Sequence, residues 1–150
     1  MTPYHFRSLF VSDFHLGTKN LNSKKLLDFL LHTESKYLYL VGDIFNLLQA
    51  QKKWYWPEIN NRIVDAIFAK AGSGTRVFYI PGNHDRILRK FSGNTINSIK
   101  IVNHAIHRTA DGRKYLVIHG DKFDPVVKKS PWLAGLGSSA YEKLLVVNRL

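Results

Sequence analysis

Three apolar runs rich in β-branched and aromatic residues divide the first half of the chain. They cover residues 6–12, 37–41 and 75–80. Such runs predict β-strands, and the unbroken run at 37–41 is typical of a strand covered on both faces. Between the strands, apolar residues recur at helical spacing after Ser23, a predicted N-cap, and after Pro57, which suits a first helical turn. This alternation of strand and helix predicts parallel βαβ units.

After the third predicted strand, the apolar runs become shorter. Three brief apolar runs cover residues 99–102, 104–109 and 114–118. The turn-forming residues at 110–113 predict a hairpin between the last two runs. From Pro131 onward, apolar residues at helical spacing predict a helical region broken by Gly135 and Gly137. We therefore predict a single α/β domain over residues 1–150.

Composition and charge narrow the class of protein. The chain of 150 residues has no cysteine, which excludes disulfides and thiolate metal sites, and no apolar run as long as a membrane span of ~20 residues. The first residues lack the features of a secretory signal, so we expect a cytoplasmic protein. Lys and Arg number 22 against 11 Asp and Glu, a net charge of +11. Such a charge favours anionic partners, whether nucleic acid, phosphorylated metabolites or an acidic membrane face.

Residues with metal-binding side chains follow four of the predicted strands. They are Asp13, His15, Asp43, Asn83 and His119. Because open α/β sheets bind ligands at the carboxyl ends of their strands, we expect these side chains to converge. One strand end alone would be explained by turn capping, whereas four with the same design favour a site.

This ligand set predicts two divalent metal ions. Two carboxylates, two imidazoles and an amide oxygen suit Mn²⁺, Fe²⁺ or Zn²⁺, and we expect Mn²⁺. Asp13 and His15 would hold one ion and Asn83 and His119 the other, with Asp43 bridging. Two ions so placed clamp the attacking and leaving oxygens of a phosphoryl displacement and lower the pKa of a shared water.

His84 and Asp85 are the candidate catalytic residues. His84 follows a predicted ligand, so its imidazole is expected near the metals, where it would stabilise charge on phosphorus or protonate the departing oxygen. We expect Asp85 to accept a hydrogen bond from that ring and fix its orientation. A helix-start cap is the alternative role for both residues, and it is compatible with catalysis.

The four motifs together resemble a known family. Asp-x-His at 13–15, Gly-Asp at 42–43, Gly-Asn-His-Asp at 82–85 and His-Gly-Asp at 119–121 are similar to the ordered motifs of the calcineurin-like metallophosphoesterases. The resemblance implies an α/β/β/α sandwich with a dinuclear centre, Asp13, His15, Asp43, Asn83 and His119 as ligands, and His84 as the catalytic histidine. Within the family, the chain most resembles the branch around UDP-2,3-diacylglucosamine hydrolase, which implies a role in lipid A synthesis.

The chain departs from the family pattern in two places. Many relatives carry a second acid in Gly-Asp-x-x-Asp, where this chain has Asn46. The final Gly-His-x-His motif of the family is absent, and His104 and His107 do not replace it, because at a spacing of three they face opposite sides of a strand. We therefore expect a sandwich that is incomplete at the C-terminus of a truncated chain.

Three further residues are candidate substrate contacts. Arg86 follows the catalytic turn, where it would contact phosphate or simply lie on a solvated face. Trp54 and Trp56 would form an apolar wall or interfacial anchor for an acylated substrate, or belong to a loop packed on the core. The expected partners are an anionic phosphorylated substrate, acylated if the branch resemblance holds, and the cytoplasmic face of the inner membrane as a peripheral contact.

Other functions remain open at this point. A nuclease or cyclic-nucleotide phosphodiesterase would use the same site, although nucleic acid is the less favoured partner. A third alternative is an inactive remnant, or a fragment that binds metal or anions without turnover.

Overall fold

The computed structural model describes residues 2–19, 21–50 and 55–123. The chain divides into two compact units, residues 1–119 and 120–150. The described part of the second unit is a short 3₁₀ helix, η2 (Gly120–Phe123). The predicted helical region from Pro131 lies outside the described residues.

A five-stranded sheet forms the centre of the first unit. In spatial order its strands are β1 (Tyr4–Val11), β2 (Thr33–Val41), β3 (Arg76–Ile80), β5 (Ile99–Ile101) and β4 (Thr95–Ile96). The first four of these are parallel, whereas β4 pairs antiparallel with β5. The predicted parallel βαβ core is therefore confirmed, and β1, β2 and β3 end at the same edge of the sheet.

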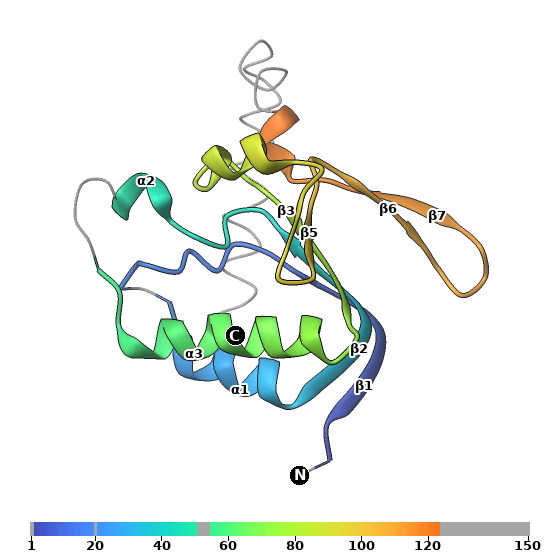
Figure 1. The fold of residues 1–150 in the computed structure, drawn as a ribbon, viewed down its shortest axis with the longest axis horizontal. Helices are drawn as coiled ribbons and strands as arrows, with labels where there is room; N and C mark the ends of the chain where they lie inside the picture. Colours follow the sequence, from blue (N-terminus) through green and yellow to red (C-terminus); the bar gives the residue numbers. More distant parts are fainter. Residues whose placement is uncertain (1, 20, 51–54, 124–150) are drawn as a thin grey trace, which may run out of the picture. The chain divides into compact units, whose positions relative to one another are not determined.

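Two helices cover one face of this sheet. Figure 1 shows α1 (Ser23–Leu31) and α3 (Glu58–Gly72) lying side by side, and their apolar residues pack on the strands. The buried cluster includes Leu30 of α1, Ile63 of α3 and Leu40 of β2. Two shorter helices, α2 (Leu47–Ala50) and the 3₁₀ helix η1 (Arg86–Phe91), follow β2 and β3.

A β-hairpin packs on the opposite face of the sheet. Its strands, β6 (Ala105–Arg108) and β7 (Lys114–Val117), pair antiparallel around the predicted turn. Val117 joins Tyr39 and Ile80 in a second buried cluster. The mixed α/β class is thus confirmed. The described elements supply the helix layer and main sheet of the predicted sandwich, with this hairpin as its second sheet.

Two predicted boundaries are wrong by a few residues. The N-cap of α1 is Asn22, whose side chain accepts a hydrogen bond from the Lys25 amide at 3.2 Å, so Ser23 is already helical. Strand β2 begins at Thr33 rather than at residue 37, because its polar first half pairs with β1 from Tyr4 onward. Strand pairing, which apolar periodicity does not report, extends the element.

Helix length among the described residues bears on membrane insertion. The longest described helix, α3, has 15 residues. No described helix combines the length and apolar character needed to cross a bilayer.

Neighbouring leucines of α1 offer a test of the helix layer. Leu30 is 1% exposed and Leu31 is 56% exposed. Leu30→Ala should lower the free energy of unfolding by about 2–5 kcal/mol, because it leaves a cavity against the sheet. Leu31→Ala is the matched control and should change it by less than about 0.5 kcal/mol. Denaturant titration measures both, and equal losses would contradict the packing described here.

Candidate metal centre

The loops that follow β1 and β2 remain paired beyond the ends of their strands. The amide of Asp13 donates to the Gly42 carbonyl at 3.1 Å, and the amide of His15 donates to the Asp43 carbonyl at 2.8 Å. A further bridge joins Leu16 to Phe45. The two loops therefore carry their polar side chains forward together from the edge of the sheet.

Three of the predicted ligands have left-handed backbone conformations. The φ angles are 56° at Asp13, 49° at His15 and 54° at Asp43. A non-glycine residue in this region costs on the order of 1–3 kcal/mol, and such residues concentrate at functional sites. The surrounding loops hold these side chains in place at the expense of backbone strain.

Two glycines allow the loops to approach one another closely. A Cβ atom on Gly82 would lie 2.2 Å from Asp43 Oδ1 and 2.7 Å from the Asp43 nitrogen. A Cβ on Gly42 would lie 2.1 Å from Cδ2 of His119, and Gly42 has a φ of +74°. Larger residues at either position would push the loop after β3 or the His119 ring away from Asp43.

Five of the predicted site residues come together in two overlapping groups. The first contains Asp13, Asp43 and His119, and the second contains His15, Asp43 and His84. In each group the candidate ligand atoms lie within 4.8 Å of one another. Asp43 belongs to both, which is the arrangement expected of a bridging carboxylate.

The division between the two groups differs from the predicted one. Asp13 groups with His119 rather than with His15, although Asp13 Oδ1 and His15 Nε2 are only 3.9 Å apart. His84, predicted to lie near the metals as the catalytic histidine, has its ring among the candidate ligands and edge-on to His15, with ring centroids 4.7 Å apart.

The donors present fit divalent cations. Asp43 is 4% exposed; its Oδ1 accepts the His84 amide at 2.8 Å, and its Oδ2 lies 3.9 Å from His119 Nε2. The buried Nδ1 of His15 has no hydrogen-bond partner among the described residues. A buried carboxylate shared by imidazoles, beside an unpaired ring nitrogen, is a donor set that Mn²⁺, Fe²⁺ or Zn²⁺ would satisfy.

Asp85 has a role different from the predicted one. Its side chain is fully buried and accepts hydrogen bonds from the amides of Gly82, at 2.6 Å, and Ile44, at 2.9 Å. The Phe45 amide, at 3.3 Å, and the Tyr79 hydroxyl also donate to it. The carboxylate thus ties the loop after β2 to the turn after β3.

Tyr79 remains a hydrogen-bond donor throughout the physiological range. Burial raises the pKa of its phenol far above the usual value, and the neighbouring Asp85 carboxylate raises it further. The proton therefore stays on the phenol oxygen and is shared with the carboxylate.

Asn46 orients the ring of His84. The prediction that Asp85 orients this ring is wrong. His84 Nδ1 lies 3.2 Å from Asn46 Oδ1, a distance that fits an N–H donor and an amide acceptor. Asn46 is buried in the loop after β2. The carboxylate of Asp85 is bound instead to backbone amides and to Tyr79, as described above.

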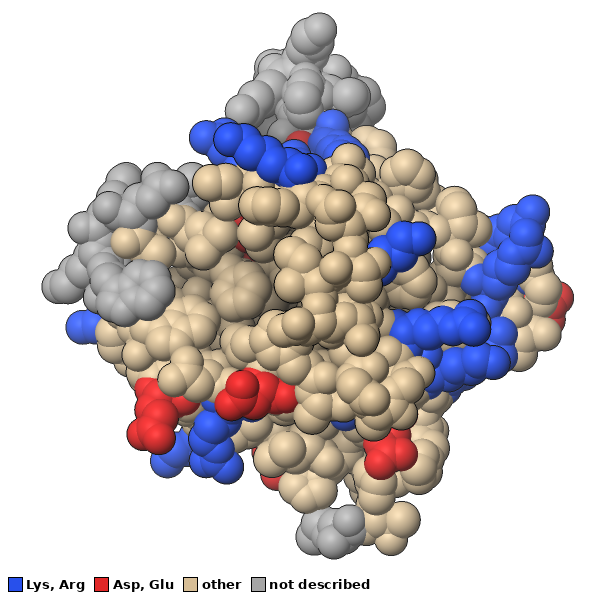
Figure 2. Space-filling view, viewed as in Figure 1, with Lys and Arg blue, Asp and Glu red and all other residues tan. Residues whose placement is uncertain are grey.

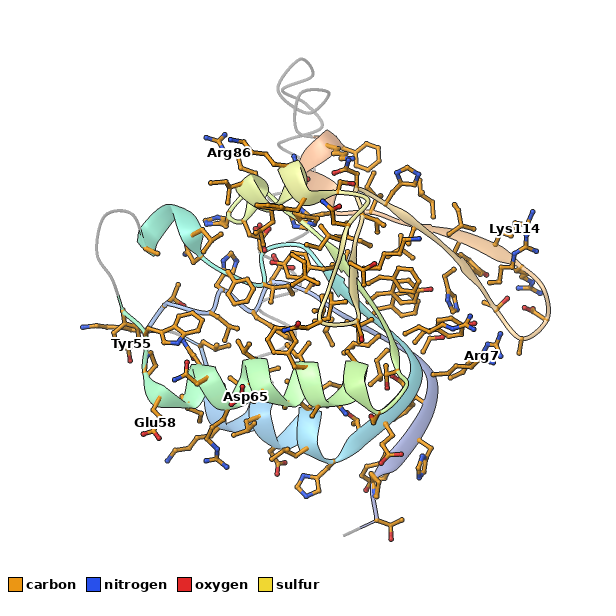
Figure 3. The ribbon with its side chains drawn as sticks, in the orientation of Figure 1. Arg7, Tyr55, Glu58, Asp65, Arg86 and Lys114 are labelled. Atoms are coloured by element: carbon orange, nitrogen blue, oxygen red, sulfur yellow. The ribbon has the colours of Figure 1, made fainter. Side chains whose placement is uncertain are left out.

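Asn83 stays a predicted ligand, and the candidate substrate contacts have different surroundings. Asn83 is half-buried in the turn after β3, and Arg86 is exposed at the start of η1 (Figure 3). Trp54 lies outside the described residues. Trp56 is half-buried, stacks on Phe45 with centroids 6.1 Å apart and donates to Asn61 Oδ1 at 2.7 Å, so it packs on the core as one of the two alternatives anticipated.

Sequence reasoning missed the role of Arg89. Its guanidinium donates to the carbonyl of Pro81 at 3.1 and 3.4 Å and so braces the turn that carries Asn83 and His84. The only signal in the sequence was a cation one helical turn after the motif.

Two apolar cavities share Phe45 and Leu88 in their linings, and one of them reaches Asn46. One of about 280 Å³ is lined by Asn46 itself and by Leu16, Trp56 and Leu88. A second, of about 180 Å³, has an entirely apolar lining and shares Phe45 and Leu88 with the first. A larger pocket of about 570 Å³ is lined by Glu34 and Lys70 at the other end of the strands, away from the metal-binding groups.

The buried Asp85 offers a test of the clip between the two loops. Asp85→Asn should lower the free energy of unfolding by about 2–4 kcal/mol, because the amide cannot accept from all four donors. The exposed Asp65→Asn is the matched control and should change it by less than about 0.5 kcal/mol. If Asp85→Asn is as stable as the control, the carboxylate is not a structural clip.

Comparison with known proteins agrees with the geometry. A family model described as calcineurin-like phosphoesterase matches residues 6–144. A protein named UDP-2,3-diacylglucosamine hydrolase from Blochmanniella pennsylvanica is 29% identical over 116 residues, which cover 75% of this chain and 46% of that protein. Proteins of the same name from Wigglesworthia glossinidia brevipalpis (28% over 122 residues, 76% and 46%) and Aromatoleum aromaticum (30% over 90 residues, 54% and 34%) also match.

The matches to curated relatives and to the family model differ in how much of each protein they cover. The chain spans less than half the length of these curated relatives. The family model, by contrast, covers most of the chain, including all four loops that build the metal-binding groups. The chain belongs to the calcineurin-like phosphoesterase family.

Proposed function

We propose that this chain hydrolyses a phosphoric ester or anhydride with the help of two divalent metal ions. The observation that carries the proposal is the buried Asp43 carboxylate, shared by two groups of candidate ligands. Two divalent ions would supply Lewis-acid stabilisation of phosphoryl oxygens and a water of lowered pKa. Asp13, Asp43 and His119 would hold one ion, and His15, Asp43 and Asn83 of the turn after β3 would hold the other.

The residues of the chain have separable tasks in this reaction. The His84 amide fixes Asp43 by donating to Oδ1, and Asn46 fixes the His84 ring through Nδ1. With Nδ1 engaged, Nε2 of His84 is the atom available to a substrate oxygen. Protonated, it would donate to the phosphoryl or departing oxygen and stabilise the charge that develops there.

The proposed substrate is a nucleotide diphosphate that carries a sugar and acyl chains, such as UDP-2,3-diacylglucosamine. Support comes from the names of the relatives and from the apolar cavity lined in part by Asn46, which suits hydrocarbon better than a polar group. The net charge of +11 favours an anionic substrate. The proposed metal is Mn²⁺, and the proposed place is the cytoplasm, in lipid A synthesis.

Turnover and metal content measured together test His84. With Mn²⁺ present, the chain should release UMP from UDP-2,3-diacylglucosamine. His84→Ala should reduce kcat by about 10²–10⁴-fold while the Mn²⁺ content per chain stays the same, because general acid–base groups contribute about this much.

The other outcomes of this experiment discriminate between hypotheses. If His84→Ala loses metal as well as activity, His84 is a ligand and not the proton donor. Faster cleavage of single-stranded DNA or cyclic nucleotides would replace the proposed substrate. Bound Mn²⁺ without any turnover would overturn the hydrolase and leave a metal-binding protein.

Asn46 gives a second, finer test of the same site. Asn46→Ala should lower kcat by about 10–100-fold with little change in KM, because the His84 ring loses its orienting partner. Asn46→Asp retains an acceptor for Nδ1 and should restore most of kcat. Equal losses in both variants would mean that the amide acts through packing rather than through its hydrogen bond.

A further inference from the structure

The largest polar cavity of the first unit lies at the amino ends of the strands, opposite the candidate metal centre. It has a volume of about 570 Å³ and is lined by the first residues of β1 and β2, by the residues before β3 and by the last turns of α1 and α3. Figure 1 shows α1 and α3 ending side by side where β2 and β3 begin. A cavity of this size is in the range of small-molecule sites.

Apolar side chains form much of the wall of this cavity. They come from β1, α1 and α3 and are Phe6, Leu30, Leu31, Ala66 and Ala69. Leu30 and Ala66 are buried, whereas Phe6 and Leu31 are 45% and 56% exposed. The apolar part of a ligand would cover these two exposed side chains, which is favourable in water.

The charged residues of the lining leave one positive charge in excess. They are His5, Glu34, Lys36 and Lys70, so two lysines stand against one glutamate. Nδ1 of His5 lies 3.3 Å from Oε2 of Glu34. The ammonium of Lys36 lies 5.9 Å from the centroid of the Tyr37 ring. Lys70 is therefore the cation of the lining for which neither a carboxylate nor an aromatic ring is a close partner within the described residues.

Lys70 is a partly desolvated cation with donors to spare. It belongs to the last turn of α3, and its ammonium donates to the carbonyl of Thr33 at the start of β2. Burial lowers the pKa of this ammonium, although the Glu34 carboxylate opposes part of that shift. Because an ammonium group has three N–H donors, an anion in the cavity could accept from those that the Thr33 carbonyl does not use.

Ser35 supplies a second polar group without a partner in the same lining. Its buried Oγ has no hydrogen-bond partner among the described residues. The other two hydroxyls nearby are engaged, since Ser73 Oγ donates to the Lys70 carbonyl at 3.0 Å and Thr75 Oγ1 donates to the Ser35 carbonyl at 2.9 Å. A buried hydroxyl without a partner is costly, and a ligand oxygen would satisfy it.

We propose that this cavity binds an organic monocarboxylate, with the carboxylate at Lys70 and Ser35 and an apolar body against Phe6 and Leu31. The single excess positive charge matches a monoanion. A phosphate monoester carries close to two negative charges at neutral pH, and the Glu34 carboxylate in the lining would repel it more strongly. The cavity shares no residue with the candidate metal centre, so this inference is independent of the proposed hydrolysis.

A separate group of cations provides the comparison that the test needs. Figure 2 shows Lys and Arg side chains gathered over the region that Figure 1 labels β6 and β7, where Figure 3 places Lys114. Lys114 is exposed and is not among the residues that line the cavity. An anion attracted only by the net charge of +11 would respond equally to the loss of Lys114 and of Lys70.

Isothermal titration calorimetry of the full chain with 3-phenylpropionate tests the proposal. This monocarboxylate should bind at a single site, whereas 3-phenylpropanol, which lacks the charge, and acetate, which lacks the apolar body, should each bind about tenfold more weakly or worse. Lys70→Met removes the charge but keeps a long apolar stem, and it should weaken binding by about 10–100-fold, as expected for a hydrogen bond between charged groups. Lys70→Arg retains the charge and should keep most of the affinity.

Lys114→Gln is the matched control and should bind 3-phenylpropionate as the unaltered chain does. Equal weakening by Lys70→Met and Lys114→Gln would overturn the proposal, because the anion would then be held by general charge. Tighter binding of inorganic phosphate than of 3-phenylpropionate would also overturn it, because the site would then prefer the more highly charged anion.

Lysine labelling of the unaltered chain avoids any loss of folding in the variants. Reductive methylation followed by mass spectrometry reports the accessibility of each lysine. Saturating 3-phenylpropionate should slow the labelling of Lys70 several-fold and leave that of Lys114 unchanged. If the labelling of Lys70 is not slowed, the ligand does not occupy this cavity and the proposal is wrong.

Discussion

The candidate metal centre depends on the buried carboxylate of Asp85. A carboxylate removed from water is costly unless its oxygens are satisfied, and here three backbone amides and the Tyr79 hydroxyl satisfy them. Those donors come from the loop after β2 and from the end and turn of β3, which places the two segments in a fixed relation. Asp43 lies in the first segment and His84 in the second. The hydrogen bond between them therefore needs no adjustment when a ligand binds.

Close approach of the loops explains why the motifs contain glycine and tolerate strain. Gly82 leaves room for Asp43, and Gly42 leaves room for His119. Each of the positive φ angles at Asp13, His15 and Asp43 costs on the order of 1–3 kcal/mol of backbone strain. The parallel strands and the clip at Asp85 supply the stability that holds this strain. The ligands are thus positioned by this framework together with contacts between themselves, such as the hydrogen bond from the His84 amide to Asp43.

Much of the framework could be predicted from the sequence, and the reason is physical. Apolar periodicity reports the buried residues of β2 and β3 and the partly buried Leu9 and Val11 of β1. Parallel strands bring their carboxyl ends to one edge whatever the loops contain. The partner of the His84 ring could not be predicted in this way. Adjacency suggested Asp85, but the turn points that carboxylate into the core, and the ring meets Asn46, 38 residues earlier in the chain. Burial of His107 was hidden for the same reason, since its partners Tyr39 and Ser8 lie on other strands.

The neutral amide of Asn46 leaves the candidate metal centre with one negative charge fewer than an aspartate at this position would give. Among the described residues of the two metal-binding groups, Asp13 and Asp43 are the carboxylates, and the other donors are imidazoles. Two divalent cations would therefore leave an excess of about two positive charges, which an aspartate at position 46 would reduce. A more positive centre attracts anionic phosphoryl oxygens more strongly, whether they belong to a monoester or to a diphosphate. The departure from the family pattern at Asn46 thus strengthens the attraction of the candidate metal centre for a phosphoryl group.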